Sequence, residues 1–553
     1  MEQIPSFNQY IEDSVIKFWD KDAFTDYKGA TLQFHDVARK IEKLHIMFEN
    51  SGVKRGDKIA LCGRNSSHWA VAFLATLTYG AIAVPVQNEF TPEQIHNIVN
   101  HSESKLLFVG DVVCTQVNPD MMPALEGIVY LPDFSIVISR SEQLTFAREH
   151  LNEIFGKRYP KYFRKEHIHY YKEQSPEELA MINYTSGTTG FSKGVMLPYR
   201  ALWGNIDYVL KCLAPNVKPG SNLVSILPMA HMYGLAVEFL FGFINGCHLY
   251  FLNRMPSPSL IAEAFAEVKP RLIVAVPLVI EKIIRRKVLA EVQTNRMKLL
   301  LNMPVINKKI KQHIRDRIME AFGGNAFEII VGGAPLNQGI EEFLNNVGVP
   351  VTIGYGTTET APLITFANYD KYKIASCGPV VDHMEAKVVS PDPANVPGEL
   401  IARGMNVMLG YYKNEEATNA VLDKDGWFHT GDLATMAPSG HIYIKGRIKN
   451  MLLGANGQNV YPEEIEDKLN NMPLVGESII IQRDTKLIAL VHPEIEDKEA
   501  MDFDDDDVKG IMDENLKTLN NQLPPFCKIA AIEIQKEEFQ KTAKKSIKRY
   551  LYK

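Results

Sequence analysis

Apolar residues along the chain form short runs separated by longer stretches with helical periodicity. The runs that we predict as buried strands begin at Lys58, Lys105, Leu179, Asn222, Arg271 and Phe327. Between most of them, apolar positions recur at helical spacing, as in residues 259–270. Strands that are apolar on both faces and alternate with helices are typical of parallel sheets covered by helices. We therefore predict an α/β fold whose large N-terminal part consists of layered, largely parallel sheets.

The pattern changes after about residue 380, where short strands are joined by tight turns. Residues 397–404 and 440–447 alternate as strands do, and Asp425-Gly426 and Ser439-Gly440 are dipeptides of the hairpin kind. This predicts a small β-barrel-like subdomain. The last hundred residues predict a separate α+β unit, with a helix that starts near Pro462 and strands over 477–482 and 486–493.

Residues 69–86 carry no charge and could be mistaken for a membrane span. A span needs about 20 apolar residues, whereas Gly80 and Pro85 interrupt this run. We predict a buried helix that ends near Gly80, followed by a buried strand, and no transmembrane segment. The N-terminus lacks a basic region followed by an apolar run, so no signal peptide is expected.

Composition narrows the class of protein further. The 553 residues include 60 Lys and Arg against 66 Asp and Glu, a net charge of −6, and 46% are hydrophobic. These values exclude a disordered chain, a collagen and a disulfide-rich mini-protein, and they argue against nucleic-acid binding, which needs a strongly basic face. The six cysteines form no CxxC pair, which indicates buried thiols in a reducing compartment and predicts a cytoplasmic protein.

A glycine-rich loop follows the strand predicted at 179–184. Glycines can direct successive N–H groups at one anion, and hydroxyls with a lysine add further donors, a composition suited to polyphosphate. The loop supplies Thr185, Ser186, Gly187, Thr188, Thr189, Gly190, Lys193 and Gly194. The Walker pattern GxxxxGK[ST] is absent. The alternative is a plain surface loop rich in small polar residues.

Five further motifs come later in the chain. They are Pro228–Gly234, Gly332–Pro335, Gly354–Pro362, Gly426–Asp432 and Lys445–Asn450. Together with the glycine-rich loop, and in this order, they resemble the motifs of the adenylate-forming superfamily, which contains acyl-CoA synthetases, peptide-synthetase adenylation domains and firefly-type luciferases.

The resemblance implies an ATP site. Adenine is implied to lie beside Gly332, Gly333, Ala334, Tyr355 and Gly356. Thr358 is implied to meet the α-phosphate, and Glu359 with Thr185 to hold Mg²⁺, a hard cation that is typically bound by one or two carboxylates plus phosphate oxygens. Thr185, Lys193 and Glu359 are the candidate catalytic residues of this part.

Asp432 is implied to accept hydrogen bonds from the ribose hydroxyls, with Arg447 beside it. The alternative for Arg447 is a surface salt bridge at a strand end. Lys449 matches the residue about which the family's small domain swings, and Gly457 lies on the face implied to form the thiol channel. The implied division is an adenylation domain over residues 1–447 and a small mobile α+β domain over 448–553.

His231 matches the residue that borders the acyl pocket, and its alternative is a packed core histidine. The apolar residues 235–252 contain a single acid, Glu238, and can line an apolar tunnel or form ordinary core. The C-terminal tail departs from the family pattern, since the aligned position of the adenylation lysine holds Ser546. Lys544 and Lys545 are therefore the candidates, and a basic solvated tail helix is the alternative.

The reaction implied is attack of a carboxylate on the α-phosphorus of ATP, followed by transfer of the acyl group to a thiol, and the expected thiol is that of coenzyme A. The tail and residues 235–252 resemble those of bacterial long-chain fatty acid ligases, so a fatty acid is the expected substrate. Three alternatives stay open: an enzyme that loads a carrier protein, a degenerate ATP-binding homologue, and a lipid-surface scaffold that uses the basic stretch 285–317 for peripheral contact with the inner membrane face. The oligomeric state is not predicted.

Overall fold

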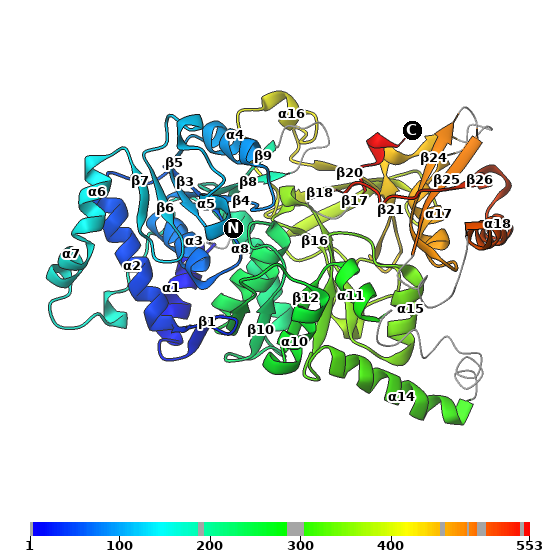
Figure 1. Cartoon of the computed structure of the whole chain (residues 1–553), viewed down its shortest axis with the longest axis horizontal. Helices are drawn as coiled ribbons and strands as arrows, with labels where there is room; N and C mark the ends of the chain where they lie inside the picture. The colour runs from blue at the N-terminus through cyan, green and yellow to red at the C-terminus, as the bar shows by residue number, and fades with distance from the viewer. Residues whose placement is uncertain are drawn as a thin grey trace.

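Two large, mostly parallel sheets form the body of the protein, as the apolar runs predicted (Figure 1). The computed structural model describes residues 4–185, 193–284, 304–453, 459–483, 486–494, 505–541 and 547–552. The first sheet has eight strands in the order β19-β9-β8-β4-β3-β5-β6-β7. Their bounds are β3 (Lys58–Cys62), β4 (Ile82–Val86), β5 (Ser104–Val109), β6 (Gly127–Tyr130), β7 (Ile136–Ser139), β8 (Leu179–Thr185), β9 (Lys193–Pro198) and β19 (Gly410–Tyr411).

The second sheet has seven strands in the order β14-β13-β12-β10-β11-β1-β2, of which only β2 runs antiparallel to its neighbour. Their bounds are β1 (Asp22–Asp26), β2 (Thr31–Gln33), β10 (Asn222–Ser225), β11 (His248–Phe251), β12 (Leu272–Ala275), β13 (Glu328–Val331) and β14 (Val351–Ile353). Parallel neighbours end at the same edge of a sheet, so β10, β12, β13 and β14 bring their carboxyl ends together.

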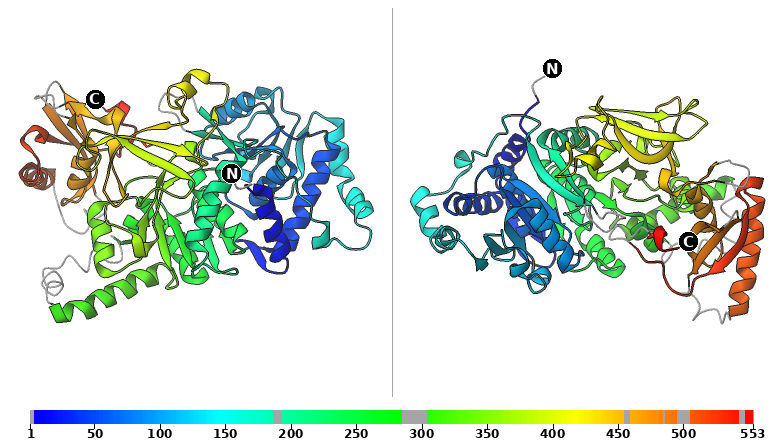
Figure 2. Two further views of the ribbon diagram at one scale, coloured as in Figure 1. Left: turned by 180° about the vertical axis from the view of Figure 1, so that it is seen from behind. Right: turned by 90° about the horizontal axis from the view of Figure 1, so that it is seen from above.

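Helices cover both sheets in the large N-terminal part (Figure 2). They are α1 (Phe7–Lys17), α2 (Phe34–Asn50), α3 (Ser67–Tyr79), α4 (Pro92–Ser102), α5 (Asp111–Cys114), α6 (Glu142–Glu149), α7 (Leu151–Arg158), α8 (Tyr199–Leu213), α9 (Phe241–Ile244), α10 (Pro258–Val268), α11 (Pro277–Ile284), α14 (Pro304–Ala321) and α15 (Gln338–Val347). Helix α3 ends at Gly80, whose φ of +85° suits glycine, and β4 follows as predicted. Among the described residues, no helix is long and apolar enough to cross a membrane.

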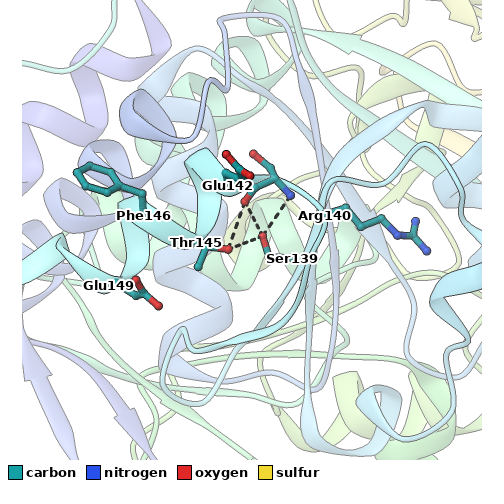
Figure 3. Close-up of a pocket in the computed structure, with 7 residues that line it drawn as sticks. Ser139, Arg140, Glu142, Thr145, Phe146 and Glu149 are labelled. Atoms are coloured by element: carbon teal, nitrogen blue, oxygen red, sulfur yellow. Dashed lines mark hydrogen bonds between the residues drawn. The ribbon is translucent and has the colours of Figure 1, made fainter.

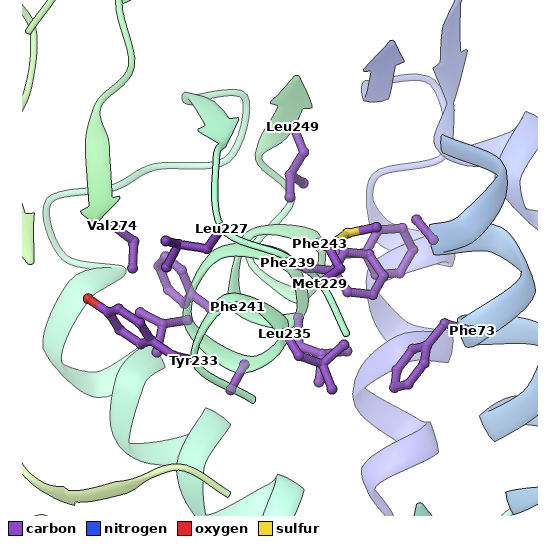
Figure 4. Close-up of a cluster of buried hydrophobic side chains, with 14 of the residues drawn as sticks. Phe73, Leu227, Met229, Tyr233, Leu235, Phe239, Phe241, Phe243, Leu249 and Val274 are labelled. Carbon is purple, nitrogen blue, oxygen red and sulfur yellow. The ribbon is translucent and has the colours of Figure 1, made fainter. Parts of the chain in front are cut away.

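One hydrophobic core joins the two sheets (Figure 4). Trp69 and Phe73 of α3 stack with ring centroids 5.4 Å apart, and Phe239 packs edge-on against both rings. Phe239 belongs to η3 (Gly234–Leu240), a π-helical turn that continues into α9. The sequence predicted an ordinary helix here, and a π-helix is a form found frequently at functional sites.

A third, antiparallel sheet follows the large body, in the order β17-β18-β20-β21. It consists of β17 (Met384–Val389), β18 (Gly398–Gly404), β20 (Phe428–Met436) and β21 (Ile442–Arg447), and the short helix α16 (Glu415–Asn419) lies between β19 and β20 in the chain. The short strands β15 (Tyr355–Gly356) and β16 (Leu363–Thr365) pair with each other. This region is the small β unit that the hairpin dipeptides predicted.

The C-terminal residues form an α+β unit with a hydrophobic core of its own. Its sheet contains β24 (Val475–Arg483), β25 (Lys486–Pro493) and β26 (Ile529–Ile534), and its helices are α17 (Pro462–Leu469) and α18 (Asp505–Asn521). The short strands β22 (Leu452–Leu453) and β23 (Asn459–Val460) precede α17. Helix α17 begins at Pro462, as predicted.

Four strand pairs of the two large sheets are antiparallel, namely β1–β2, β6–β7, β8–β9 and β9–β19. β8 and β9 run antiparallel, with Thr185 paired to Lys193, and β19 adds to β9 in the same manner. The glycine-rich loop therefore connects the two strands of a hairpin. An apolar run predicts burial, but it does not reveal the direction of the neighbouring strand.

Candidate functional site

The predicted site residues follow the carboxyl ends of several strands. Thr185 ends β8, Gly332 follows β13, and Tyr355 follows β14. In open α/β sheets, ligands bind at this edge. Hydrogen bonds tie the segments together: the Asn183 side chain donates to the Ala230 carbonyl at 2.9 Å, and the Gly354 N–H donates to the Val331 carbonyl at 3.1 Å.

Thr185 and Lys193 are paired at the end of the β8–β9 hairpin where the chain passes from one strand to the other. The rest of the predicted phosphate loop, Ser186, Gly187, Thr188, Thr189 and Gly190, lies outside the described residues. The structure thus describes the two residues that flank the loop, Thr185 with its hydroxyl and Lys193 with its ammonium group, and they are cross-strand partners.

Tyr233 couples the His231 segment to the glycines after β13. Its hydroxyl donates to the Ile330 carbonyl at 3.0 Å, and a Cβ on Gly332 would come within 3.0 Å of its ring. Gly333 has a φ of +83°, and Ala334 beside it is half-buried. His231 is half-buried, and its Nδ1 accepts a hydrogen bond from the Tyr233 N–H at 3.3 Å. Gly332 therefore accommodates the Tyr233 ring, and the exposed Gly333 is the position after β13 that stays open to a flat ring.

The segment 354–362 carries Tyr355, Thr358 and Glu359 within one turn and a short strand. A Cβ on Gly356 would lie 1.8 Å from the Pro362 carbonyl oxygen, so only glycine fits this close backbone approach. Thr358 is buried and Glu359 half-buried in the 3₁₀ turn Thr358–Thr360.

A tyrosine that the sequence analysis did not single out contacts both Glu359 and Lys193. The Tyr411 hydroxyl donates to Glu359 Oε1 at 2.9 Å, and Lys193 Nζ lies 4.6 Å from the centroid of the Tyr411 ring. In the sequence, Tyr411 belongs to the run Gly410-Tyr411-Tyr412, which predicts a turn and gives no sign of a site residue. Its partners lie far away in the sequence, so local pattern alone could not reveal the contact.

Asp432 joins the third sheet to the Tyr355 segment. It is 4% exposed, accepts the Tyr355 hydroxyl at 2.5 Å, and lies 2.9 Å from Arg447 Nε, its cross-strand partner. Burial raises the pKa of Asp432, and the Arg447 guanidinium offsets part of that rise. Burial and the neighbouring carboxylate raise the pKa of Tyr355, so its hydroxyl remains a donor. The cluster is suited to bind a diol, since Asp432 is an acceptor held in place by two partners.

A polar clamp inside the apolar run holds the chain leading to His231. Glu238, 1% exposed, accepts hydrogen bonds from the Ser225 hydroxyl at 3.1 Å and from the N–H groups of Ile226 and Leu227 at 3.2 Å each. Burial raises the pKa of Glu238 to about 8, although these donors lower it. The single acid in residues 235–252 therefore has a structural partner set, which a lone charge in an apolar run could have signalled.

Asn65, which follows β3, extends this clamp to the first sheet. Its Nδ2 donates to the Ser225 hydroxyl at 3.0 Å and the Leu227 carbonyl at 2.6 Å, and its Oδ1 accepts from the Met229 N–H at 2.9 Å. The exit of β10 is thus held by residues from both large sheets.

Lys449 lies exposed in the 3₁₀ turn Ile448–Asn450, which follows β21. On one side of it, Lys445 pairs with Glu464 at 3.2 Å, and on the other the Asn450 side chain donates to Glu463 at 2.6 Å. Helix α17 also contacts α15, where Asp467 accepts the Gln338 N–H at 3.2 Å. Lys445 and Gln338 therefore provide two polar contacts between the C-terminal unit and the rest of the described chain.

Three predicted residues of the C-terminal unit, Gly457, Lys544 and Lys545, lie outside the described residues. The described residues on either side of positions 542–546 make several contacts with the rest of the C-terminal unit. Lys541 bridges to Ile547 as in an antiparallel pair, Lys541 Nζ lies 2.7 Å from Glu477, and Arg549 pairs with the buried Glu466.

A surface pocket of about 420 Å³ lies elsewhere, between β7 and α6 (Figure 3). Its hydroxyl groups satisfy one another, since Thr145 donates to Ser139 at 2.9 Å. It contains none of the predicted site residues, and its lining residues are Ser139, Arg140, Ser141, Glu142, Thr145, Phe146 and Glu149.

The donor set fits a metal that shares its coordination with phosphate. Within the described ranges, no three His, Cys, Asp or Glu side chains cluster as a metal cage would require. Glu359 offers one carboxylate that is fixed by Tyr411. Mg²⁺ is commonly bound by one or two carboxylates plus substrate phosphates, and these residues fit that mode.

Comparison with known proteins agrees with the motif order. Residues 11–412 match the family model of the AMP-binding enzymes, and residues 449–552 match that of the AMP-binding enzyme C-terminal domain. The chain is 31% identical over 507 residues to a long-chain-fatty-acid–CoA ligase of Escherichia coli O157:H7, covering 86% of this chain and 82% of that one. It is 29% identical to the ligase of the same name from Salmonella typhimurium, over 84% and 81% of the two chains.

Solved structures share the fold. The anthranilate CoA ligase AuaEII in complex with anthranoyl-AMP superposes with a TM-score of 0.79 at 18% identity, over 99% of this chain and 97% of that chain. ATP-bound MatB from Rhodopseudomonas palustris superposes with a TM-score of 0.75 at 23% identity, over 99% and 98%. With the family models spanning most of its length, the chain belongs to the AMP-binding enzymes, the adenylate-forming acyl-CoA ligase family that its motifs resemble.

Proposed function

We propose that this protein is an ATP-dependent ligase that activates a long-chain fatty acid as an acyl-adenylate and transfers the acyl group to coenzyme A. The observation that carries the proposal is the Tyr355 segment, which bears the tyrosine bound to Asp432 and, four residues later, the carboxylate bound by Tyr411. One short stretch of chain therefore contacts the proposed ribose acceptor, Asp432, and carries the carboxylate suited to a phosphate-bound cation.

On the nucleotide side, Asp432 accepts from the ribose hydroxyls, with Arg447 beside it. The adenine lies against Tyr355 and the exposed backbone at Gly333, next to Gly332, whose own open side is filled by the Tyr233 ring. Thr358 meets the α-phosphate. Lys193 and the loop that begins at Thr185 hold the phosphates that depart.

Glu359, with Thr185, would hold Mg²⁺, which when bound neutralises the negative charge that develops on the phosphates. The substrate carboxylate itself is the nucleophile. Its oxygen forms a bond to the α-phosphorus as the bond to the bridging oxygen of the β-phosphate breaks, and pyrophosphate leaves. The protein's task is to hold two anions in line, for which fixed donors are effective.

In the second step, the sulfur of coenzyme A attacks the acyl carbon and AMP leaves. We propose that residues 448–553 turn about Lys449 between the two steps, so that the face bearing Gly457 lines the path of the thiol. The polar contacts of α17 with β21 and α15 support this motion, because water can replace such contacts when the unit turns.

The acyl chain is proposed to lie beside His231 and the π-helical turn η3. The names of the relatives support a long-chain acid, and the buried aromatic residues of η3 support an apolar wall. One methylene changes binding by only about 1–3 kcal/mol, so the preferred chain length must be measured.

The test is AMP formation from ATP with a series of straight-chain fatty acids and a benzoate, with and without coenzyme A. We expect AMP to accumulate with the fatty acids only when coenzyme A is present, with acyl-CoA as the second product. Pyrophosphate exchange that coenzyme A does not affect would indicate a carrier-protein acceptor. Absence of both reactions with every acid would indicate a degenerate homologue.

The basic stretch 285–317 requires a separate measurement. Its described part lies on α14, where Lys308 and Lys309 are exposed. Co-sedimentation with anionic vesicles in the absence of nucleotide would reveal peripheral membrane contact, and its absence would leave this stretch a solvated helix face. The cytoplasmic location expected from the sequence stays a prediction.

A further inference from the structure

The Gly410-Tyr411-Tyr412 run contains two neighbouring tyrosines, each of which donates to a glutamate and has a lysine over its ring. Tyr411 is buried and donates to Glu359 at 2.9 Å, with Lys193 over its ring. Tyr412 donates to Glu103 at 3.0 Å, with Lys413 5.2 Å from its ring centroid. Lys58 also lies 5.6 Å from the Tyr412 ring centroid. Each tyrosine thus contacts a glutamate and at least one lysine, but only the contacts of Tyr411 belong to the proposed ATP site.

The backbone fixes Tyr411 against both partners. β19 pairs with β9, with Tyr411 opposite Val195, two residues beyond Lys193. The Met408 N–H donates to the Glu359 carbonyl, and the Tyr411 N–H donates to the Thr418 hydroxyl, both at 2.9 Å. The position of Tyr411 is therefore set by strand pairing and by these two hydrogen bonds.

Gly410 makes this approach possible. Its φ is +138°, and a Cβ there would come within 2.7 Å of the Thr418 side chain. A side chain at Gly410 would collide with Thr418, whose hydroxyl accepts the Tyr411 N–H, so we expect it to disturb one of the contacts that hold Tyr411.

The chemistry of the contact follows from its geometry. The Tyr411 hydroxyl lies 2.9 Å from Glu359 Oε1 and donates a hydrogen bond to it. A hydrogen bond on one carboxylate oxygen restricts rotation of the carboxylate, and the other oxygen then keeps one orientation. The ring face offers Lys193 a contact that does not neutralise its charge.

We propose that Tyr411 is the positioning residue of the ATP site: its hydroxyl orients the Glu359 carboxylate for Mg²⁺, and its ring holds Lys193 ready for phosphate. This inference rests on the proposed function, in which Glu359 takes the metal and Lys193 the phosphates. The inference assigns a role to Tyr411, for which the sequence predicted only a place in a turn.

The test uses Tyr411→Phe, which removes one oxygen atom and keeps the ring, and Tyr412→Phe as the matched control. ATP is titrated calorimetrically into the full-length protein at several Mg²⁺ concentrations, with no acid present. Loss of a residue that orients a metal ligand typically costs about 10- to 100-fold in metal affinity. We expect the Mg²⁺ concentration for half-maximal enhancement of ATP binding to rise roughly tenfold in Tyr411→Phe and to stay unchanged in Tyr412→Phe.

A second substitution separates the ring from the hydroxyl. Tyr411→Leu removes both, so we expect it to weaken ATP binding in the absence of Mg²⁺ as well, whereas Tyr411→Phe leaves that binding unchanged. Tyr411→Phe alone decides the proposal if the leucine variant fails to fold. An unaltered Mg²⁺ dependence in Tyr411→Phe would overturn it.

Failure of this inference is distinguishable from failure of the proposed function. If the wild type forms acyl-CoA while Tyr411→Phe keeps the Mg²⁺ dependence of the wild type, the inference is wrong and the function stands. If no acid supports turnover but the Mg²⁺ dependence of ATP binding shifts as expected, the function is wrong and the positioning role is supported. ATP binding that is independent of Mg²⁺ in the wild type would reject the positioning role.

Discussion

Asp432 and Arg447 are cross-strand partners whose charges meet at 2.9 Å, with the carboxylate buried and the guanidinium side chain 61% exposed. The anion is thus held inside the protein and the cation at its surface. Removing water from a carboxylate is costly unless partners replace the water, and Tyr355 and Arg447 do so here. A ligand diol would add the remaining donors.

Asp432→Asn tests this relationship. The amide oxygen can still accept from Tyr355, so the fold should be preserved, but the charged acceptor is lost. Hydrogen bonds to charged groups contribute about 1.5–3 kcal/mol, so we expect the KM for ATP to rise roughly 10-fold or more while the KM for the fatty acid changes little. The control is Asp425→Asn, an exposed aspartate of the preceding turn. An unchanged KM for ATP would place the ribose elsewhere.

Glu359→Gln tests the proposed metal ligand. The substitution keeps the acceptor for Tyr411 and removes the charge. A bound metal ion supplies several kcal/mol of transition-state stabilisation, so we expect kcat/KM at limiting Mg²⁺ to fall about 100-fold, with partial recovery at high Mg²⁺. The matched control is Glu103→Gln, which lies beside Tyr412. A metal titration that matches the wild type would exclude Glu359 as a ligand.

The tail lysines are tested by alanine at Lys544, Lys545 and Lys548 in turn, with pyrophosphate exchange as the measure of adenylation. We expect one of the three variants to lose exchange strongly, since a cation that touches the incoming carboxylate acts in the transition state. Transfer of a chemically supplied acyl-adenylate to coenzyme A should remain. If all three variants exchange normally, the tail is a structural element.

Lys449→Pro tests the proposed hinge. Proline fixes φ near −65°, so the turn Ile448–Asn450 would lose the backbone freedom that a rotation requires. We expect pyrophosphate exchange to be spared and thioester formation to slow by at least roughly tenfold, because domain closure commonly limits such steps. Equal loss of both half-reactions would argue against a hinge at this residue.

Glu238→Gln tests the buried clamp through the pH dependence of stability. The pKa of Glu238 is about 8 in the folded protein and lies near 4.3 in an unfolded chain. Between these values the folded state binds more protons than the unfolded state, so the stabilising contribution falls as pH rises from about 5 to about 8. Thermal unfolding from pH 5.5 to 8.5 should therefore show the Tm advantage of the wild type over Glu238→Gln shrinking with pH.

The control for this measurement is Glu415→Gln, an exposed glutamate at the start of α16. Its Tm difference from the wild type should not vary with pH. A difference between wild type and Glu238→Gln that grew with pH would mean that the clamp holds an ionised carboxylate throughout.

The sequence predicted those parts of the structure that depend on local pattern. Gly80 ends α3, Pro462 begins α17, and the apolar runs are the strands of two layered sheets, because capping, ring geometry and burial act over a few residues. The family was predicted from motif order. The roles of the individual site residues stay predictions.

Contacts between distant residues could not be predicted in this way. Tyr411 and Glu359 are 52 residues apart, and no periodicity links them. The antiparallel direction of β9 and the π-helical form of η3 depend on neighbours from other parts of the chain. Glu238 showed a local anomaly, a charge among apolar residues, but its donors come from the exit of a different strand.

Asn65 gives the large domain a mechanical property. Because its amide binds the exit of β10 from the far side of the core, sliding one large sheet past the other would break three hydrogen bonds at once. These bonds add a polar tie between the two large sheets beside the apolar core that they share. In the proposed cycle, a rotation of residues 448–553 would then leave this sheet edge, and an acyl-adenylate held there, in place.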